Sequence, residues 1–220
     1  KVWAEVARVA EAQSAPDRAL RAYEATLALD PTDARALAAI VDVLEAQARW
    51  PELVSAIRRR SQAAGSGWQQ RQDLVRIANI QASFLDAPKD AIATWSEVSS
   101  AYGESADVVD ALSELYTRTA AHASLAELLG RAADREDEHL ASVRCRLGET
   151  YFKQLADAPA AVAAYRRALL ADPTNESARQ GLALLADDAG VRAEAIAALA
   201  RSYELADEWE PLLALLDQRL

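Results

Sequence analysis

The stretch that decides the fold is Val143-Arg-Cys-Arg-Leu-Gly-Glu-Thr-Tyr151, followed by Ala160-Ala-Val-Ala-Ala-Tyr-Arg-Arg-Ala-Leu-Leu-Ala-Asp-Pro173. In the first segment, Leu147, Gly148 and Tyr151 have the offsets that place residues on one face of a helix. Gly148 has no side chain, so a neighbouring helix can approach closely at that point. We therefore expect Gly148→Leu to overpack the contact and to destabilise the fold by about 1–3 kcal/mol.

The second segment predicts the helix that makes this approach. Ala161, Tyr165 and Ala168 share one helical face, with small residues on either side of a single ring. Asp172-Pro173 ends the helix, because the residue before a proline is disfavoured in the α conformation. Together the two segments predict an antiparallel helical hairpin.

The same pattern recurs along the chain at a nearly fixed interval, which is typical of a repeat array. In each copy, one residue is followed four positions later by an aromatic or aliphatic residue, and in the odd-numbered units the first of the two is small. Successive copies are 34, 38, 34 and 36 residues apart. Ala-Pro pairs at 15–16, 87–88 and 158–159 add a longer period of about 71, and 26–32 and 168–174 are near copies. The pairs are Ala19/Tyr23, Leu53/Ile57, Ala91/Trp95, Leu125/Leu129 and Ala161/Tyr165.

These residues resemble the tetratricopeptide repeat (TPR), a helix–turn–helix of 34 residues. The resemblance covers nearly the whole chain and implies an all-α fold, a right-handed α-solenoid of antiparallel helix–turn–helix repeats with about 13 helices. The even units depart from the family pattern, since Leu53 and Leu125 replace a small residue and Gly103 replaces the proline. The matching residues are Trp3, Val6, Ala7, Ala10, Ala19, Tyr23 and Pro31 in the first unit; Leu147, Gly148, Tyr151, Ala161, Tyr165 and Pro173, with one extra residue in the turn; and Ile196, Leu199, Ala200, Tyr203, Leu212 and Leu216.

The repeat frame is ambiguous after Pro173. Trp209-Glu-Pro-Leu212 resembles Trp50-Pro-Glu-Leu53, which makes 209–220 the second helix of a pair whose first helix is 191–206. The helix at 175–189 is then expected to be unpaired or irregular. Counting one repeat from Ala161 would instead give Ala195 the position of the small residue.

We expect residues 1–220 to form a single array, because each repeat contacts only its neighbours. Lys1 and Leu220 both fall inside helical patterns, so the chain is expected to be a fragment of a longer array. Ala64-Gly65-Ser66-Gly67 is the longest flexible connection, and we expect a bend near 64–68.

The amino-acid composition limits the classes of partner that this chain is expected to bind. The net charge of −10 disfavours nucleic acid and anionic membrane surfaces, and no apolar run is long enough to cross a bilayer. A protein or peptide partner, basic or apolar, fits better, although the charge also serves solubility. The single cysteine excludes an internal disulfide framework and is compatible with a reduced compartment, and a soluble, cytoplasmic protein is expected.

The sequence predicts no enzyme, cofactor or metal site, because it lacks phosphate-binding glycine loops, nucleophile elbows and paired histidines. His122 is expected in a turn, as Trp50 is in its copy. His139, with Glu136 and Glu138, is interpreted as a helix start rather than a metal site, and Cys145 between two arginines as structural rather than as a reactive thiolate.

Two further groups are interpreted as structural. We place Trp3 and Trp95 in the core and Trp50, Trp68 and Trp209 at helix starts, in preference to aromatic ligand sites. Arg58-Arg59-Arg60 is expected on the solvated end of a helix, with an intramolecular or tail-to-array contact as the alternative.

The resemblance to the TPR family implies what this chain is expected to do. TPR proteins generally bind peptides or helices of other proteins in a concave groove lined by the first helix of each pair, so a protein–protein interaction scaffold is expected. The alternatives are a regulatory or targeting domain whose activity lies outside this fragment, and end-to-end self-association. The lysine and asparagine clamp of chaperone-binding members is not reproduced. The expected groove residues are Arg8, Glu11, Arg35, Asp42, Glu45, Asn79, Glu149 and Lys153.

Overall fold

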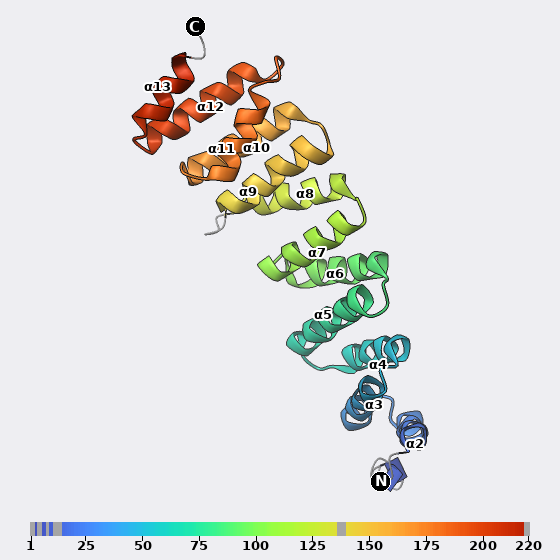
Figure 1. Ribbon diagram of the computed structural model, residues 1–220. Coiled ribbons are helices and arrows are strands. Elements are labelled where there is room, and N and C mark those ends of the chain that lie inside the picture. The colour runs from blue at the N-terminus through green and yellow to red at the C-terminus, as the bar shows by residue number, and fades with distance from the viewer. Residues whose placement is uncertain (1–2, 4–5, 8, 11–14, 136–139, 218–220) are drawn as a thin grey trace. The chain divides into compact units, whose positions relative to one another are not determined.

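The computed structural model describes residues 3, 6–7, 9–10, 15–135 and 140–217. Within these residues every regular element is a helix, and consecutive α-helices run in alternating directions within each unit (Figure 1). The first expected helix, about 1–13, lies largely outside the described residues. The helices are α2 (Pro16–Leu29), α3 (Ala34–Ala46), α4 (Trp50–Ala63), α5 (Gly67–Ser83), α6 (Pro88–Tyr102), α7 (Ala106–Arg118), α8 (His122–Ala133), α9 (Leu140–Glu149), the π-helix η1 (Thr150–Gln154), α10 (Ala158–Ala171), α11 (Glu176–Leu185), α12 (Arg192–Leu205) and α13 (Trp209–Asp217).

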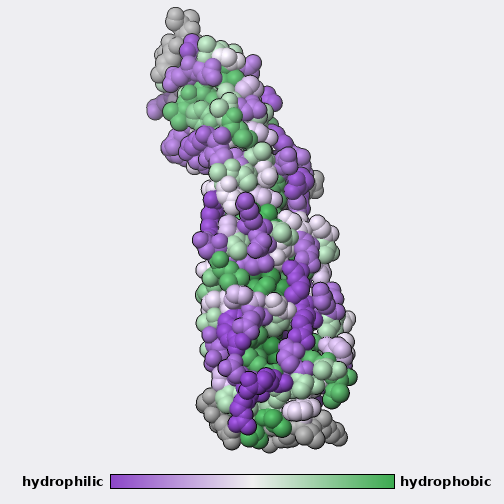
Figure 2. Space-filling view, turned by 90° about the vertical axis from the view of Figure 1, so that its right-hand side faces the viewer, coloured by the Kyte–Doolittle hydropathy of each residue, from purple (hydrophilic) through white to green (hydrophobic). Residues whose placement is uncertain are grey.

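The chain divides into two compact units, Lys1–Leu115 and Tyr116–Leu220. In the first, each helix from α2 to α6 packs on the next, as in a linear helical array. Its core is aliphatic and includes Val41, Leu53, Ile57 and Ile77, all fully buried. On the face shown in Figure 2, apolar side chains (green) lie in separate patches between polar ones (purple).

In the second unit, helices also contact the neighbour after next. α9 packs on α10 and α11, and α10 packs on α11 and α12. The core is formed largely by alanine and leucine around one aromatic ring, that of Tyr165, which is 2% exposed. Small residues let these helices lie close enough for such double contacts.

Helix starts and stops follow the local signals in the sequence. The three Ala-Pro pairs open α2, α6 and α10, where proline's missing N–H is harmless. The Asp33 carboxylate caps α3 by accepting hydrogen bonds from the backbone N–H groups of Arg35 and Ala36 at 3.0 and 2.9 Å. Gly103, with φ of +89°, ends α6 as expected.

The near copies 26–32 and 168–174 adopt the same turn. Thr32 donates from its backbone N–H and its hydroxyl to one oxygen of Asp30, at 3.1 and 2.9 Å. Thr174 makes the same pair of bonds to Asp172, at 3.1 and 2.8 Å. The Asp-Pro-Thr sequence therefore encodes both the helix stop and the turn that follows it.

One type of turn recurs between paired helices. It contains a residue in the left-handed conformation, with φ between 48° and 56°, and the next N–H donates to a carbonyl five or six residues back. This bond satisfies carbonyls that the helix end leaves unpaired. The left-handed residues are Ala48, Asp86, Ala120, Ala156 and Asp207.

The extra residue in the turn after α9 is absorbed by a π-helix. α9 continues directly into η1, and the Leu155 N–H donates to the Thr150 carbonyl at 3.1 Å, five residues back. A π turn holds one more residue than an α turn. The extra residue therefore does not displace the left-handed turn at Ala156 relative to the start of α10.

Gly148 permits the close approach that its sequence position predicts. A Cβ atom at Gly148 would lie 2.7 Å from two ring carbons of Tyr165, and one at Gly181 of α11 would lie 2.5 Å from Cζ of the same ring. The ring is therefore held between two helices, each of which lacks a side chain at the contact. Burial raises the pKa of the Tyr165 hydroxyl above its ordinary value.

The expectation that the helix at 175–189 is unpaired is wrong. α11 packs on both α10 and α12, and Ala178, Leu182 and Leu185 are at most 1% exposed. The reason is Gly181, whose missing side chain admits the Tyr165 ring. The left-handed turn at Asp207 is of the type found between paired helices, and it joins α12 to α13 as expected. α12 therefore packs on α11 as well as on its own partner α13.

Trp3 also departs from expectation. It is 47% exposed and does not lie in the core, whereas Trp95 does, at 4% exposed. A residue at this position of the repeat is buried only where a neighbouring helix packs over it.

Candidate binding groove along α5

An open groove of about 580 Å³ runs along α5 within the first unit. Its floor and walls come from α5, from both ends of α4 and from the last turns of α3. We call it the α5 groove. Its lining residues are Glu45, Trp50, Arg60, Trp68, Gln69, Gln72, Asp73, Val75, Arg76, Asn79, Ile80, Ser83 and Phe84.

A buried carboxylate anchors one wall of the groove. Asp73 is 1% exposed, and its two oxygens accept hydrogen bonds from Nε and Nη2 of Arg60 at 3.1 and 2.5 Å. The Gln69 amide donates to the same carboxylate at 2.9 Å. The forked pair fixes the end of α4 against the first turns of α5.

The run Arg58-Arg59-Arg60 lies towards the C-terminal end of α4 and is partly exposed to solvent, and it also makes the intramolecular contacts that were the alternative. Arg58 pairs with Glu97 of α6 at 2.6 Å, and Arg59 pairs with Glu24 of α2 at 2.7 Å. Successive helical side chains point about 100° apart. Consequently three adjacent arginines bind carboxylates on three different helices.

The middle of the groove carries one more ion pair and two amides. Arg76 of α5 binds Glu45 of α3 at 2.6 Å across the groove. The side-chain amides of Gln72 and Asn79 make no hydrogen bond to any part of the chain that the structure describes. Both amides are exposed, and their donors and acceptors are open to a ligand.

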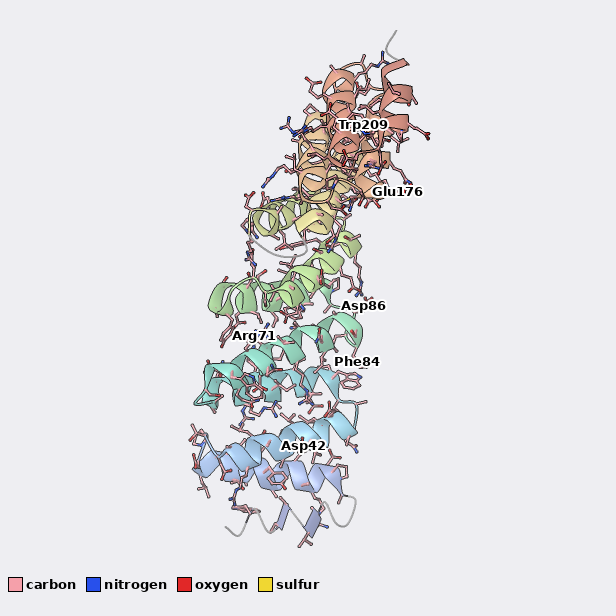
Figure 3. All side chains as sticks on the ribbon, turned by 90° about the vertical axis from the view of Figure 1, so that its left-hand side faces the viewer. Asp42, Arg71, Phe84, Asp86, Glu176 and Trp209 are labelled. Atoms are coloured by element: carbon pink, nitrogen blue, oxygen red, sulfur yellow. The ribbon has the colours of Figure 1, made fainter. Side chains whose placement is uncertain are left out.

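Aromatic side chains stand at both ends of α5. Trp68, the second residue of α5, is 70% exposed. Phe84, just past its last residue, is 57% exposed and stacks on Trp50 with ring centroids 4.1 Å apart. Figure 3 shows Phe84 and Arg71, from the two ends of α5, on opposite sides of the view. Sequence reasoning took Trp68 and Trp50 for structural residues and did not single out Phe84.

A second polar contact ties α5 to α7. Arg71 donates to Ser105 at 3.1 Å and to Asp107 at 2.7 Å. The hydrogen bond from Ser105, together with the Arg71 guanidinium, holds the pKa of Asp107 below its ordinary value. The first turns of α5 are thus fixed from two sides, by α4 and by α7.

The structure brings together only some of the expected groove residues. Glu45 and Asn79 both line the α5 groove. Arg35 and Asp42 are exposed on α3 without lining it, and Figure 3 labels Asp42 on that helix. In the second unit, Glu149 and Lys153 form an ion pair one turn apart at 2.5 Å. Arg8 and Glu11 lie outside the described residues.

The two described residues that the sequence offers for chemistry, His122 and Cys145, lie on different helices. His122 is the first residue of α8, as Trp50 is of α4, and His139 lies outside the described residues. Burial, together with the nearby Glu149 carboxylate, raises the pKa of the Cys145 thiol, which disfavours a thiolate. Among the described residues, no group of three or more histidine, cysteine or acidic side chains could hold a metal ion. No described helix is both long and apolar enough to cross a membrane.

Comparison with solved structures identifies the fold. A tetratricopeptide repeat protein from Parabacteroides merdae matches 84% of this chain over 78% of its own length, with a TM-score of 0.53 and 13% identity. A human IFIT1 dimer with m7Gppp-AAAA matches 96% of this chain over 52% of its length, with a TM-score of 0.51 and 10% identity. The chain is therefore a divergent TPR-like array, an all-α solenoid of helical repeats.

Comparison at the level of sequence gives no match. No family model matches the chain. No curated protein matches it significantly either.

Proposed function

We propose that this chain is a protein–protein interaction scaffold that holds a peptide or helix of a partner protein in the α5 groove. The single observation that carries the proposal is the groove itself, an open hollow whose walls are fixed by ion pairs and whose middle presents two amides without intramolecular partners. Fixed walls reduce the entropy lost on binding, and amides bind the backbone of an extended chain without regard to its sequence.

Asn79→Ala is expected to weaken binding of groove ligands by about fivefold or more, because one hydrogen bond typically contributes about 1 kcal/mol. Ligands are obtained by selecting a random peptide library on the wild-type chain, and affinities are then measured by isothermal titration calorimetry. Gln62→Ala is the matched control, since Gln62 also presents an exposed amide, on α4 outside the groove.

The proposal fails if the library yields no saturable ligand. It also fails if the selected peptides bind both variants as tightly as the wild type. Equal weakening by the two variants would indicate a general effect of amide removal rather than a site in the groove.

A second candidate function is self-association through α13. Trp209 and Leu213 of this helix are 59% and 61% exposed, which is unusual for two large apolar side chains one turn apart. Trp209→Ser combined with Leu213→Ser is expected to shift the chain towards monomer in sedimentation-velocity runs across a range of concentrations. A wild-type chain that sediments as a monomer at every concentration would exclude this candidate.

A further inference from the structure

The charges inside the α5 groove are already balanced. Arg76 is paired with Glu45 at 2.6 Å, and Arg60 is paired with the buried Asp73. A charged ligand side chain would compete with these pairs for their partners, whereas an uncharged side chain leaves both pairs intact. The groove therefore favours an uncharged ligand, which is the apolar rather than the basic of the two kinds of partner that the net charge of the whole chain suggested.

The exposed aromatic side chains give the ligand two anchor points. Trp68 presents a large face to solvent, and the stack of Phe84 on Trp50 holds a second ring at the other end of the groove. Large, nearly rigid rings lose little conformational entropy on binding, and they pack well against flat apolar side chains. Aromatic-lined grooves of this kind bind proline-rich segments in the polyproline II conformation.

The length of the groove defines the length of the ligand. Trp68 lies in the first turn of α5, and Phe84 follows its last residue 16 positions later, which corresponds to a rise along the helix axis of roughly 24 Å at 1.5 Å per residue. A polyproline II segment rises about 3.1 Å per residue, so about eight residues bridge the two anchors. Its carbonyl groups have no internal hydrogen bonds, and the Gln72 and Asn79 amides between the anchors can donate to them.

We infer that the α5 groove binds an uncharged, proline-rich segment of about eight residues, held in the polyproline II conformation between Trp68 and the Trp50–Phe84 stack. This inference rests on the proposed function, because it names the class of peptide that the same groove takes. The aromatic anchors supply most of the affinity, and the amides orient the backbone.

The test uses four peptides of equal length with the full chain: octaproline, a neutral glycine–serine peptide, a lysine-containing peptide and a glutamate-containing peptide. Octaproline is expected to bind saturably in isothermal titration calorimetry and to shift the Trp68 indole N–H signal in NMR spectra. Trp68→Ala is expected to weaken it about tenfold, the effect of losing one aromatic contact together with its buried area.

Leu29→Ala is the matched control, because Leu29 is 79% exposed in the same unit and does not line the groove. It is expected to leave the affinity for octaproline unchanged. Trp68 is itself so exposed that its removal is expected to leave the fold intact, which a circular dichroism spectrum checks.

The outcomes separate this inference from the proposed function. If another peptide of the set binds in a Trp68-dependent manner and octaproline does not, the groove is a binding site but the inference about its ligand is wrong. If octaproline binds equally well to the wild type and to Trp68→Ala, the inference is also wrong. If neither these peptides nor any library peptide binds, both the inference and the proposed function are overturned.

Discussion

Replacing Arg60 with leucine is expected to lower the free energy of unfolding by about 3 kcal/mol, because it leaves a buried carboxylate without its cation. Asp73 is 1% exposed, and among the described residues only the Gln69 amide would still donate to it after the change. A carboxylate that folding removes from water without compensation is among the most destabilising groups a protein can hold. The measurement is urea denaturation followed by circular dichroism.

The neighbouring arginine provides the control. Arg59→Leu removes an ion pair whose partners, Arg59 and Glu24, are 45% and 50% exposed. Such pairs contribute about 0–1 kcal/mol. Equal destabilisation by Arg59→Leu and Arg60→Leu would show that the Asp73 pair has no special role. The double variant Arg60→Leu, Asp73→Leu is expected to recover part of the loss, because it removes the unpaired charge.

Alanine at Gly181 is expected to destabilise the second unit by about 2 kcal/mol through overpacking. The added Cβ would lie 2.5–2.8 Å from three atoms of the Tyr165 ring. The ring has no room to shift, because Gly148 of the other helix is so close that a Cβ added there would lie 2.7 Å from Cδ1 and Cε1 of the same ring. For a chain of this size the loss corresponds to a fall in the melting temperature of roughly 4–8 °C. Gly148→Ala is expected to act similarly, and Gly148→Leu more strongly.

Gly130 of α8 is the matched control for both substitutions. A Cβ there would meet no atom within 4 Å. Gly130→Ala is expected to stabilise the chain by about 0.5–1 kcal/mol, because alanine loses less backbone entropy than glycine in a helix. Destabilisation by Gly130→Ala, or a Gly181→Ala variant as stable as the wild type, would contradict the packing described for Tyr165.

The sequence alone determined the features that depend on a few adjacent residues. Proline after alanine opens α2 and α10, the Asp33 side chain caps α3, and the positive φ of Gly103 ends α6. The repeat period then placed the hairpins, and Gly148 indicated where two helices come closest. These signals are local because capping, turn geometry and helical periodicity are set within one or two turns of the chain.

Only the tertiary structure decided the partners and the exposure of long side chains. Arg58 and Arg60 bind carboxylates on different helices, 39 and 13 residues away, so neither partner follows from the local charge pattern. Trp3 and Trp95 both occupy positions that the repeat pattern places in the core, yet one is 47% exposed and the other is buried at 4%. Burial depends on whether another helix covers a given face, and that is settled by packing across repeats.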